Sequence, residues 1–233
     1  MIDALRGWVV RLVSPVVWRI PGHAPRKLEA FGRAEEGSRI DLLAAAHATP
    51  ALARRARYLR HALDETRHAA MFWRRANELR DERGLPRQGR PRADSEALFA
   101  NLGELRFLAF VHLGERRGCR QFEVYARHFA RRGDARTRAL FEAILVDEQQ
   151  HQAYTRELLV ELAGGERAAR RELGRAARWE AWRTWRRAGR ALAGAAYQVA
   201  MTAVYLVFAP LASLGLRPRK PDRRRWLDAG EPS

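Results

Sequence analysis

The chain has 233 residues, of which 47% are hydrophobic, and this length suits one sizeable core with a smaller appendage. The single cysteine, Cys119, excludes an internal disulfide, a zinc ribbon and a rubredoxin-type iron site, because each needs a second thiolate; it fits a reducing compartment. The formal net charge of +17 would suit a nucleic-acid ligand. However, nearly all of the basic residues are Arg, which indicates compositional bias, and the surplus per residue is highest in 166–233.

The first apolar stretch covers residues 2–20, where four charged residues interrupt the apolar ones. Charges inside the run and the lack of a small-residue cleavage site argue against a signal peptide. The pattern predicts an amphipathic surface helix. We treat residues 1–22 as a separate N-terminal segment, which closes at Pro21-Gly22.

The middle of the chain, residues 23–165, contains almost no alternating or β-branched runs of strand length, so it is predicted to be all helical. Turn-forming residues divide it at Thr49-Pro50, at 84–92 and at 132–134, and Gly164-Gly165 ends it. The predicted helices cover about 26–47, 50–83, 104–131 and the residues from the 132–134 turn to 163, with a short helix at 95–101. This order predicts an all-α four-helix bundle.

A second apolar stretch, Ala191 to Leu216, has 26 residues without a charge and would extend roughly 39 Å as a helix, against a hydrocarbon core of about 30 Å. Basic clusters flank it on both sides, so a crossing would violate the positive-inside rule, and Pro210 weakens a span further. We therefore expect residues 166–233 to form a basic, apolar extension attached to the membrane surface; a fifth helix covering the bundle is the alternative. The tryptophans expected at headgroup depth are Trp179, Trp182, Trp185 and Trp226.

Two copies of one motif lie in the second and fourth predicted helices: Asp64-Glu65-Thr66-Arg67-His68 and Asp147-Glu148-Gln149-Gln150-His151. Both read Asp-Glu-x-x-His. Residues three apart project from one face of a helix, so a Glu carboxylate and a His imidazole at this spacing can bind one metal ion. A single Glu-x-x-His arises readily by chance, whereas two at corresponding places call for a common cause.

A carboxylate upstream of each motif lies in an otherwise apolar helical row. Glu115 shares its row with Leu108, and Glu35 shares its row with Leu28, whereas the neighbouring Glu36 falls in a solvated row. A charged group in an apolar row faces the core, where an unpaired carboxylate is unfavourable. Distances along the helices from the two turns place both carboxylates level with the motif glutamates, provided that the helices run antiparallel.

Four Glu and two His directed inward from four helices resemble the ferritin-like diiron-carboxylate superfamily, over about residues 26–163. The resemblance implies a ferritin-like antiparallel four-helix bundle with two Fe ions, or Mn in place of Fe. It assigns Glu35, Glu65 and His68 to one ion and Glu115, Glu148 and His151 to the other, with Glu65 and Glu148 as bridges. Asp64 and Asp147 resemble acids that orient ligand imidazoles, with an exposed position as the alternative.

Several residues near the motifs are weaker candidates. His61, four residues before Glu65, could be a third imidazole ligand, but a surface or supporting position is the simpler interpretation, and the same holds for His112. Cys119 is interpreted as a small apolar residue near the site. The side chains expected to line a substrate space are Phe31, Phe72, Val111, Phe122 and Phe141.

The resemblance implies a diiron oxidoreductase of the monooxygenase or hydroxylase kind, with molecular oxygen as co-substrate. The apolar ends favour a lipophilic substrate drawn from the membrane and attachment to the lipid surface at the cytoplasmic face of a bacterial inner membrane. The alternatives are a ferroxidase or peroxide-scavenging ferritin-like protein and a tRNA-modifying diiron hydroxylase. We expect a separate electron donor, or electrons from the substrate, and no nucleic-acid partner; a homodimer is left open.

Overall fold

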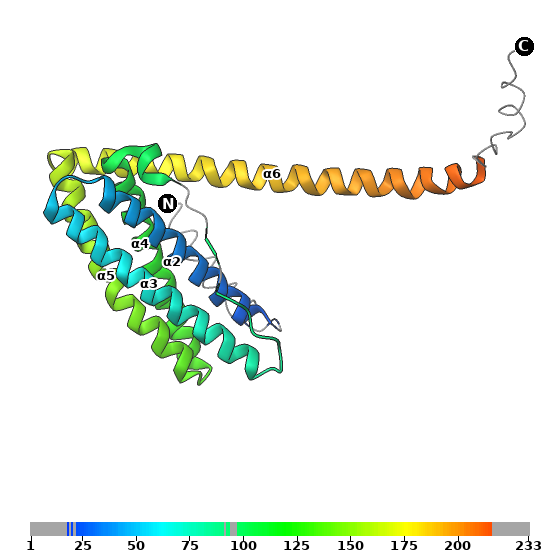
Figure 1. The fold of residues 1–233 in the computed structure, drawn as a ribbon, viewed down its shortest axis with the longest axis horizontal. Coiled ribbons are helices and arrows are strands. Elements are labelled where there is room, and N and C mark those ends of the chain that lie inside the picture. Colours follow the sequence, from blue (N-terminus) through cyan, green and yellow to red (C-terminus); the bar gives the residue numbers. More distant parts are fainter. Residues whose placement is uncertain (1–17, 19, 21, 91, 94–96, 216–233) are drawn as a thin grey trace, which may run out of the picture. The chain divides into compact units, whose positions relative to one another are not determined.

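The computed structural model describes residues 18, 20, 22–90, 92–93 and 97–215. Every regular element in these residues is an α-helix, which confirms the predicted all-α class and gives a helical bundle (Figure 1). The helices are α2 (His23–Ala48), α3 (Leu52–Asp81), α4 (Leu98–Arg131), α5 (Ala135–Ala163) and α6 (Glu166–Gly215). Most of the predicted N-terminal helix, residues 1–17, lies outside the described residues.

The helices end and begin at the predicted turns. Gly164, with φ 74°, follows α5 in the left-handed conformation that glycine adopts readily. Asp134 precedes α5, and its side chain accepts a hydrogen bond from the Thr137 backbone N–H at 2.9 Å. Inside α4, Gly103 leaves the helical conformation with φ 70° and ψ 162°, so a short helical segment precedes the long one, as the sequence predicts.

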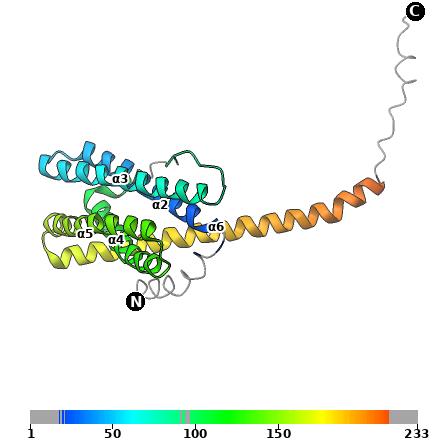
Figure 2. The same cartoon turned by 90° about the horizontal axis from the view of Figure 1, so that it is seen from below.

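The chain divides into two compact units, Met1–Glu180 and Ala181–Ser233. In the first unit, α2 lies along α3 and α4 lies along α5, and the two pairs pack together (Figures 1 and 2). The first turns of α6 belong to this unit, since Ala169 and Ala176 are buried and the Trp179 ring packs edge-on against Phe110 at 5.7 Å. The unit thus extends past the boundary expected at residue 165. Trp179 contacts the bundle, unlike the headgroup position expected for it.

Two clusters of buried apolar residues lie in the bundle, one toward each end of its helices. One contains Tyr58 and Phe107, and the other contains Phe72, Phe122 and Phe141. Fully burying such a side chain contributes roughly 1.5–3 kcal/mol, so these clusters hold the helices together. The middle turns of α3, α4 and α5 lie between the two clusters, and these turns carry buried ionisable side chains.

Four of the five side chains expected to line a substrate space pack against one another. The Phe31 ring centroid lies 5.2 Å from that of Phe72 and 5.5 Å from that of Phe122, and Phe122 lies 5.5 Å from Phe141. Val111 belongs to the other cluster. These rings therefore form part of the apolar core on one side of the ionisable layer.

Trp18, near the end of the predicted N-terminal helix, is buried against the bundle. Its ring meets the rings of Tyr125 and Phe129 edge-on, with centroids 5.0 and 5.1 Å apart. Trp18 is therefore a core residue, whereas the sequence pattern assigned it to an amphipathic surface helix. Ile20, two residues later, is exposed.

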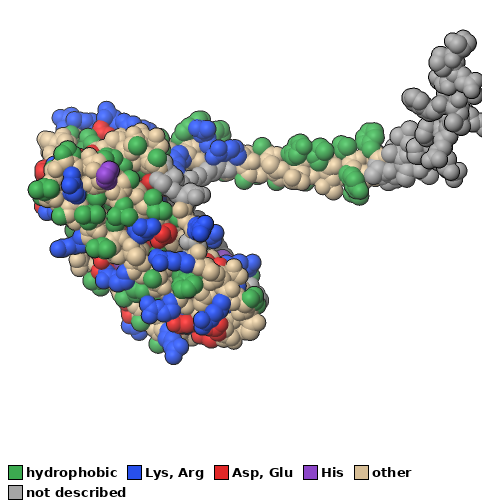
Figure 3. Space-filling model, in the orientation of Figure 1, with side chains coloured by type: hydrophobic (Ala, Val, Ile, Leu, Met, Phe, Trp, Pro, Cys, Tyr) green, Lys and Arg blue, Asp and Glu red, His purple; other side chains and the backbone are tan. Residues whose placement is uncertain are grey.

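The second unit presents large apolar side chains to solvent. Leu192, Tyr205 and Phe208 are among the exposed side chains along α6, and Trp182 and Trp185 are exposed and stack with ring centroids 5.3 Å apart. Figure 3 shows hydrophobic side chains on the surface of α6. Across the residues described, no helix has both the length and the apolar character needed to traverse a membrane. Trp226 lies outside the described residues.

Candidate metal centre

The buried layer between the two apolar clusters contains the side chains of both motifs. Helix α3 contributes Glu65 and His68, α4 contributes Glu115, and α5 contributes Glu148 and His151, and all five are buried. The three-residue spacing within each motif directs its Glu and its His to the same side of the helix. The structure therefore brings together five of the six residues that the resemblance assigns to metal.

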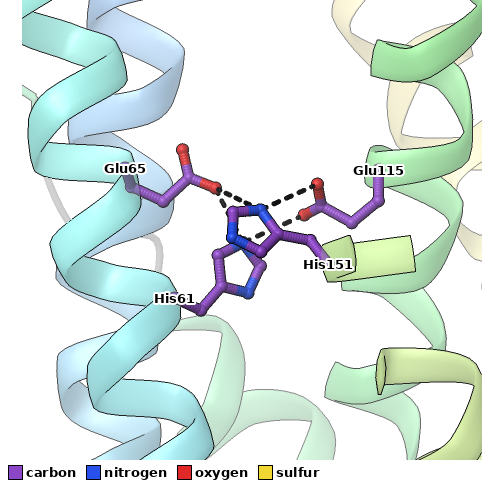
Figure 4. A group of neighbouring side chains, drawn as sticks. All are labelled: His61, Glu65, Glu115 and His151. Atoms are coloured by element: carbon purple, nitrogen blue, oxygen red, sulfur yellow. Dashed lines mark hydrogen bonds and ion pairs between the residues drawn. The ribbon is translucent and has the colours of Figure 1, made fainter. Parts of the chain in front are cut away.

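One group of potential ligand atoms comes from His61, Glu65, Glu115 and His151, all within 4.8 Å of one another (Figure 4). His61 Nε2 lies 2.8 Å from Glu65 Oε1 and 3.4 Å from Glu115 Oε1. His151 Nδ1 lies 3.9 Å from Glu115 Oε2 and 4.0 Å from Glu65 Oε1. Two carboxylates and two imidazoles from three helices thus converge on one point.

A second group comes from Glu65, His68 and Glu148. His68 Nδ1 lies 3.4 Å from Glu148 Oε1 and 3.8 Å from Glu65 Oε2. Glu65 belongs to both groups and directs a different oxygen to each, Oε1 to the first and Oε2 to the second. Its carboxylate is therefore placed to bridge two adjacent ions.

The two motifs support each other through their aspartates. His68 Nε2 donates to Asp147 Oδ2 at 3.0 Å, and His151 Nε2 donates to Asp64 Oδ2 at 3.2 Å, so each aspartate holds the histidine of the other motif. Arg67 Nη2 joins the pair, at 2.9 Å from Asp64 Oδ1 and 2.7 Å from Asp147 Oδ2. An ionised carboxylate only accepts hydrogen bonds, so Nε2 carries the proton in each ring and the lone pair of a neutral ring lies on Nδ1.

Four buried atoms at this centre have no hydrogen-bond partner: Glu65 Oε2, His68 Nδ1, Glu148 Oε1 and His151 Nδ1. A buried polar atom left without a partner costs roughly 1–3 kcal/mol, and four in one layer need a common explanation. All four are atoms of the kinds that bind metal ions, and ligand atoms that share one ion at about 2.1 Å lie roughly 3–4 Å apart. The residues present therefore fit a pair of divalent ions with mixed oxygen and imidazole ligands.

The electrostatics of the centre reflect several carboxyl groups that are buried close together. Burial raises the pKa of Glu148, and the Glu115 carboxylate adds to the rise, which takes it well above the ordinary value. Burial lowers the pKa of His61 and His68, but the carboxylates around them outweigh this effect and raise both pKa values to about 10. Protons on the His61 and His68 rings and on the Glu148 carboxyl group therefore limit the buried negative charge when no metal ion is bound. A divalent cation would replace those protons.

A glycine makes room for one of the carboxylates. Gly118 lies on α4 one turn after Glu115, and a Cβ atom built there would come within 2.9 Å of Glu148 Oε2. Contacts this short essentially never occur at real Cβ atoms, so a larger residue would require the end of the Glu148 side chain to shift. The present position of the Glu148 carboxylate thus depends on the absence of a side chain at Gly118.

Glu35, the sixth predicted ligand, lies outside the two groups of converging ligand atoms. It is half-buried. Its carboxyl group still interacts electrostatically with the centre. Burial and the carboxylates of Glu65 and Glu148 raise the pKa of Glu35 well above the ordinary value. The adjacent Glu36 pairs with Arg39 at 2.7 Å, as expected of a solvated row. The structure therefore places Glu35 beside the centre.

His61 occupies a place that the sequence interpretation did not favour. It is fully buried, which rules out a surface position, and its ring lies 3.7 Å from the ring of His151. Its Nδ1 atom lies 2.5 Å from the hydroxyl oxygen of Tyr154, which leaves Nε2 directed at Glu65 and Glu115. The sequence contained an indication of this position, because His61 lies one helical turn before Glu65 on the same face of the helix.

Two further residues lie near the centre without joining it. His112 is buried, and its Nδ1 atom lies 3.2 Å from the Gln152 carbonyl oxygen and 3.2 Å from Thr155 Oγ1. Burial, helped by Glu148 and Glu115, raises the pKa of the Cys119 thiol to about 12. Cys119 is therefore a protonated, buried thiol rather than a reactive one.

Comparison with known proteins returns no match: no family model, no curated protein and no solved structure matches this chain.

Proposed function

We propose that this chain is a ferritin-like diiron-carboxylate protein and that its centre activates molecular oxygen. The observation that carries the proposal is the pair of crossed contacts, Asp147 with His68 and Asp64 with His151, around four buried ligand atoms that lack partners. Such carboxylate-supported imidazoles are typical of metal-ligating histidines.

The composition of the core supports an antiparallel four-helix bundle as the finer description of the fold. The start of α3 shares a core cluster with the end of α5, through Tyr58 and Leu158, and the end of α3 shares the other cluster with the start of α5, through Phe72 and Phe141. Helices that run in opposite directions produce this pairing of ends. It also brings the two motifs to one level.

The proposed ligands divide into two sets that share Glu65. One ion would be held by His61, Glu65, Glu115 and His151 and the other by Glu65, His68 and Glu148, with Glu35 available beside them. Hard carboxylate oxygens with imidazole favour Fe, with Mn as the alternative. When bound, two ferrous ions supply the electrons that reduce oxygen.

The protein's own residues have defined tasks in this proposal. Asp147 and Asp64 hold the Nε2 protons of His68 and His151, which keeps each Nδ1 lone pair directed at the centre. Arg67 pairs with both aspartates and offsets part of their negative charge. The apolar clusters on both sides of the layer exclude water from it.

We propose that the substrate is lipophilic and is drawn from a membrane surface to which the second unit attaches at the cytoplasmic leaflet. Exposed apolar side chains between Leu192 and Phe208, preceded by the exposed Trp182 and Trp185, support the attachment. Basic residues near the lipid surface add about 1 kcal/mol each on anionic lipid. A separate donor would return electrons to the centre.

Two experiments test this proposal. Iron-loaded protein is exposed to oxygen with a bacterial lipid extract, and mass spectrometry should detect an oxidised lipid; rapid peroxide consumption with no such product would favour a scavenging function. In the second, deletion of residues 188–233 should abolish flotation with anionic vesicles and leave the helicity and metal content of the bundle intact. Unfolding of the truncated protein would contradict the attachment, because residues 188–233 would then be part of the core.

A further inference from the structure

The two copies of the motif differ in the residues that flank them. Four residues before its glutamate, the α3 copy has His61, whereas the α5 copy has Ile144. Three residues after its histidine, the α5 copy has Tyr154, whereas the α3 copy has Met71. Residues three or four apart share one face of a helix, so all four lie on the faces that carry the motifs. Two of these flanking positions are therefore polar and the two corresponding positions are apolar.

The packing of α3 against α5 brings the two polar residues together. The His61 Nδ1 atom lies 2.5 Å from the Tyr154 hydroxyl oxygen. The Tyr154 ring meets the rings of His61 and His151 edge-on, with centroids 5.5 and 6.3 Å apart. Ile144 lies in one of the two apolar clusters, and Met71 packs against the same cluster. The polar pair thus lies beside His151, whereas its apolar counterparts belong to the core.

The contact with Tyr154 directs the His61 ring at the centre. A hydroxyl oxygen accepts hydrogen bonds, so His61 Nδ1 can donate to Tyr154 while the lone pair of Nε2 binds an ion. The Nε2 atom lies 2.8 Å from Glu65 Oε1 and 3.4 Å from Glu115 Oε1 (Figure 4). Tyr154 thus occupies the supporting position for His61 that an aspartate occupies for each of the other two histidines.

The two groups of potential ligand atoms consequently differ in composition. The group that contains His61 and His151 offers two imidazoles and two carboxylates, whereas the group that contains His68 offers one imidazole and two carboxylates. Imidazole suits Fe and the later first-row metals, whereas carboxylate and water suit harder ions. Addition of Glu35 to the second group would still leave it with one imidazole against two. The first group is therefore the stronger donor set for Fe(II) and Co(II).

We infer that the two ion sites are unequal: the group that contains His61 binds its ion first and more tightly, and Tyr154 is the positioning residue for His61. This inference rests on the metal centre proposed above. The group that contains His68 then holds the second ion, which exchanges more readily. A chain that has taken up a single ion carries it between Glu65 and Glu115.

Stepwise titration of the metal-free, full-length protein with Co(II), followed by visible absorbance, tests the inequality. Two steps are expected, with dissociation constants at least about tenfold apart, because even a residue that only supports a ligand alters metal affinity roughly 10- to 100-fold. Each step should have its own absorption spectrum, since the donor sets differ. Two ions bound with one affinity would overturn the inference and leave the metal centre standing. Absence of cobalt binding would overturn both.

Tyr154→Phe removes only the hydroxyl group that orients His61. It should weaken the first step roughly tenfold, at the lower end of the range for supporting residues, and leave the second step unaltered. Tyr125→Phe is the matched control, because it also removes a hydrogen-bonded hydroxyl from the bundle, one whose partner is Gln121 at 2.7 Å. Equal affinities for the first ion in the two variants would overturn the role of Tyr154.

Two histidine variants assign the steps to the sites. His61→Ala should weaken the first step by more than Tyr154→Phe does, because it removes the ligand itself. His68→Ala should instead remove the second step and retain the tight first step with its spectrum. Loss of the tight step in His68→Ala, with the tight step retained in His61→Ala, would reverse the assignment and overturn the inference.

Discussion

His68 donates a hydrogen bond from Nε2 to Asp147 Oδ2, 3.0 Å away on another helix and in the other copy of the motif. The reciprocal contact joins His151 to Asp64 at 3.2 Å. Each copy of Asp-Glu-x-x-His is thus completed by the other, so the two copies form one structural unit.

Asp147→Asn should weaken binding at the ion site that contains His68, by roughly 10- to 100-fold, because a neutral amide no longer supports the charge on the metal-bound imidazole. Titration of metal-free protein with Co(II), followed by visible absorbance, measures the affinity. Glu142→Gln, an exposed change on the same helix, is the control. Equal cobalt affinity in the two variants would mean that the crossed contact has no role in metal binding.

Gly118→Ala should disturb the Glu148 carboxylate, since the new methyl group would lie 2.9 Å from Glu148 Oε2. We expect the bound metal to fall from two ions toward one per chain, as elemental analysis would measure. Gly114→Ala on the same helix meets no atom within 4 Å. That control should keep both ions and stabilise the helix by up to about 1 kcal/mol, the difference in helix propensity between Ala and Gly. If the two variants hold the same metal content, the close approach has no functional meaning.

Glu35→Ala tests whether the residue beside the centre moves into the ligand set when metal is bound. We expect a lower affinity for one of the two ions, because Glu35 already lies in the field of Glu65 and Glu148. Glu36→Ala, one position away and paired with Arg39, should bind metal normally. Competition with a chelator gives both affinities, and an unaltered affinity in Glu35→Ala would remove this residue from the site.

Asp134→Ala should lower the free energy of unfolding by about 1 kcal/mol, because Asp134 caps α5. Burial opposes ionisation of Asp134, but Thr137 and Arg75 hold its pKa below the ordinary 3.8. A depressed carboxyl pKa stabilises the fold above about pH 4, and the stabilisation is lost as the pH falls through the folded-state pKa. Urea unfolding at several pH values should therefore show the difference between the two proteins shrinking with acidification. A difference that does not depend on pH would contradict this assignment.

Much of the fold and the centre could be predicted from local periodicity. The helix boundaries follow from turn residues such as Gly133 and Gly164. The two motifs can be recognised because the Glu and the His of each lie three residues apart. The crossed aspartate contacts could not be predicted, because they depend on how α3 and α5 face each other. Neither could the continuity of α6, in which residues 166–180 pack on the bundle and the following residues form a separate unit.

Glu35 and His61 show where the periodicity was insufficient. Glu35 was preferred to Glu36 from its apolar row, and His61 was interpreted as a surface or supporting residue, so neither position was decided by an observed distance. The α3 backbone places His61 Nε2 at 2.8 Å from Glu65 Oε1, one turn away on the same helix. Glu35 lies on α2. The periodicity of a single helix does not give the distance between α2 and the other helices, so the position of Glu35 relative to the centre could not be predicted.

Iron content tests the central claim most directly. The full-length protein is loaded with Fe(II) without oxygen, passed through a desalting column and measured for iron and protein, beside the double variant His68→Ala/His151→Ala. The account predicts two iron ions per chain for the unmodified protein and close to none for the variant. Less than one ion per chain in the unmodified protein, or equal iron in both, would contradict it.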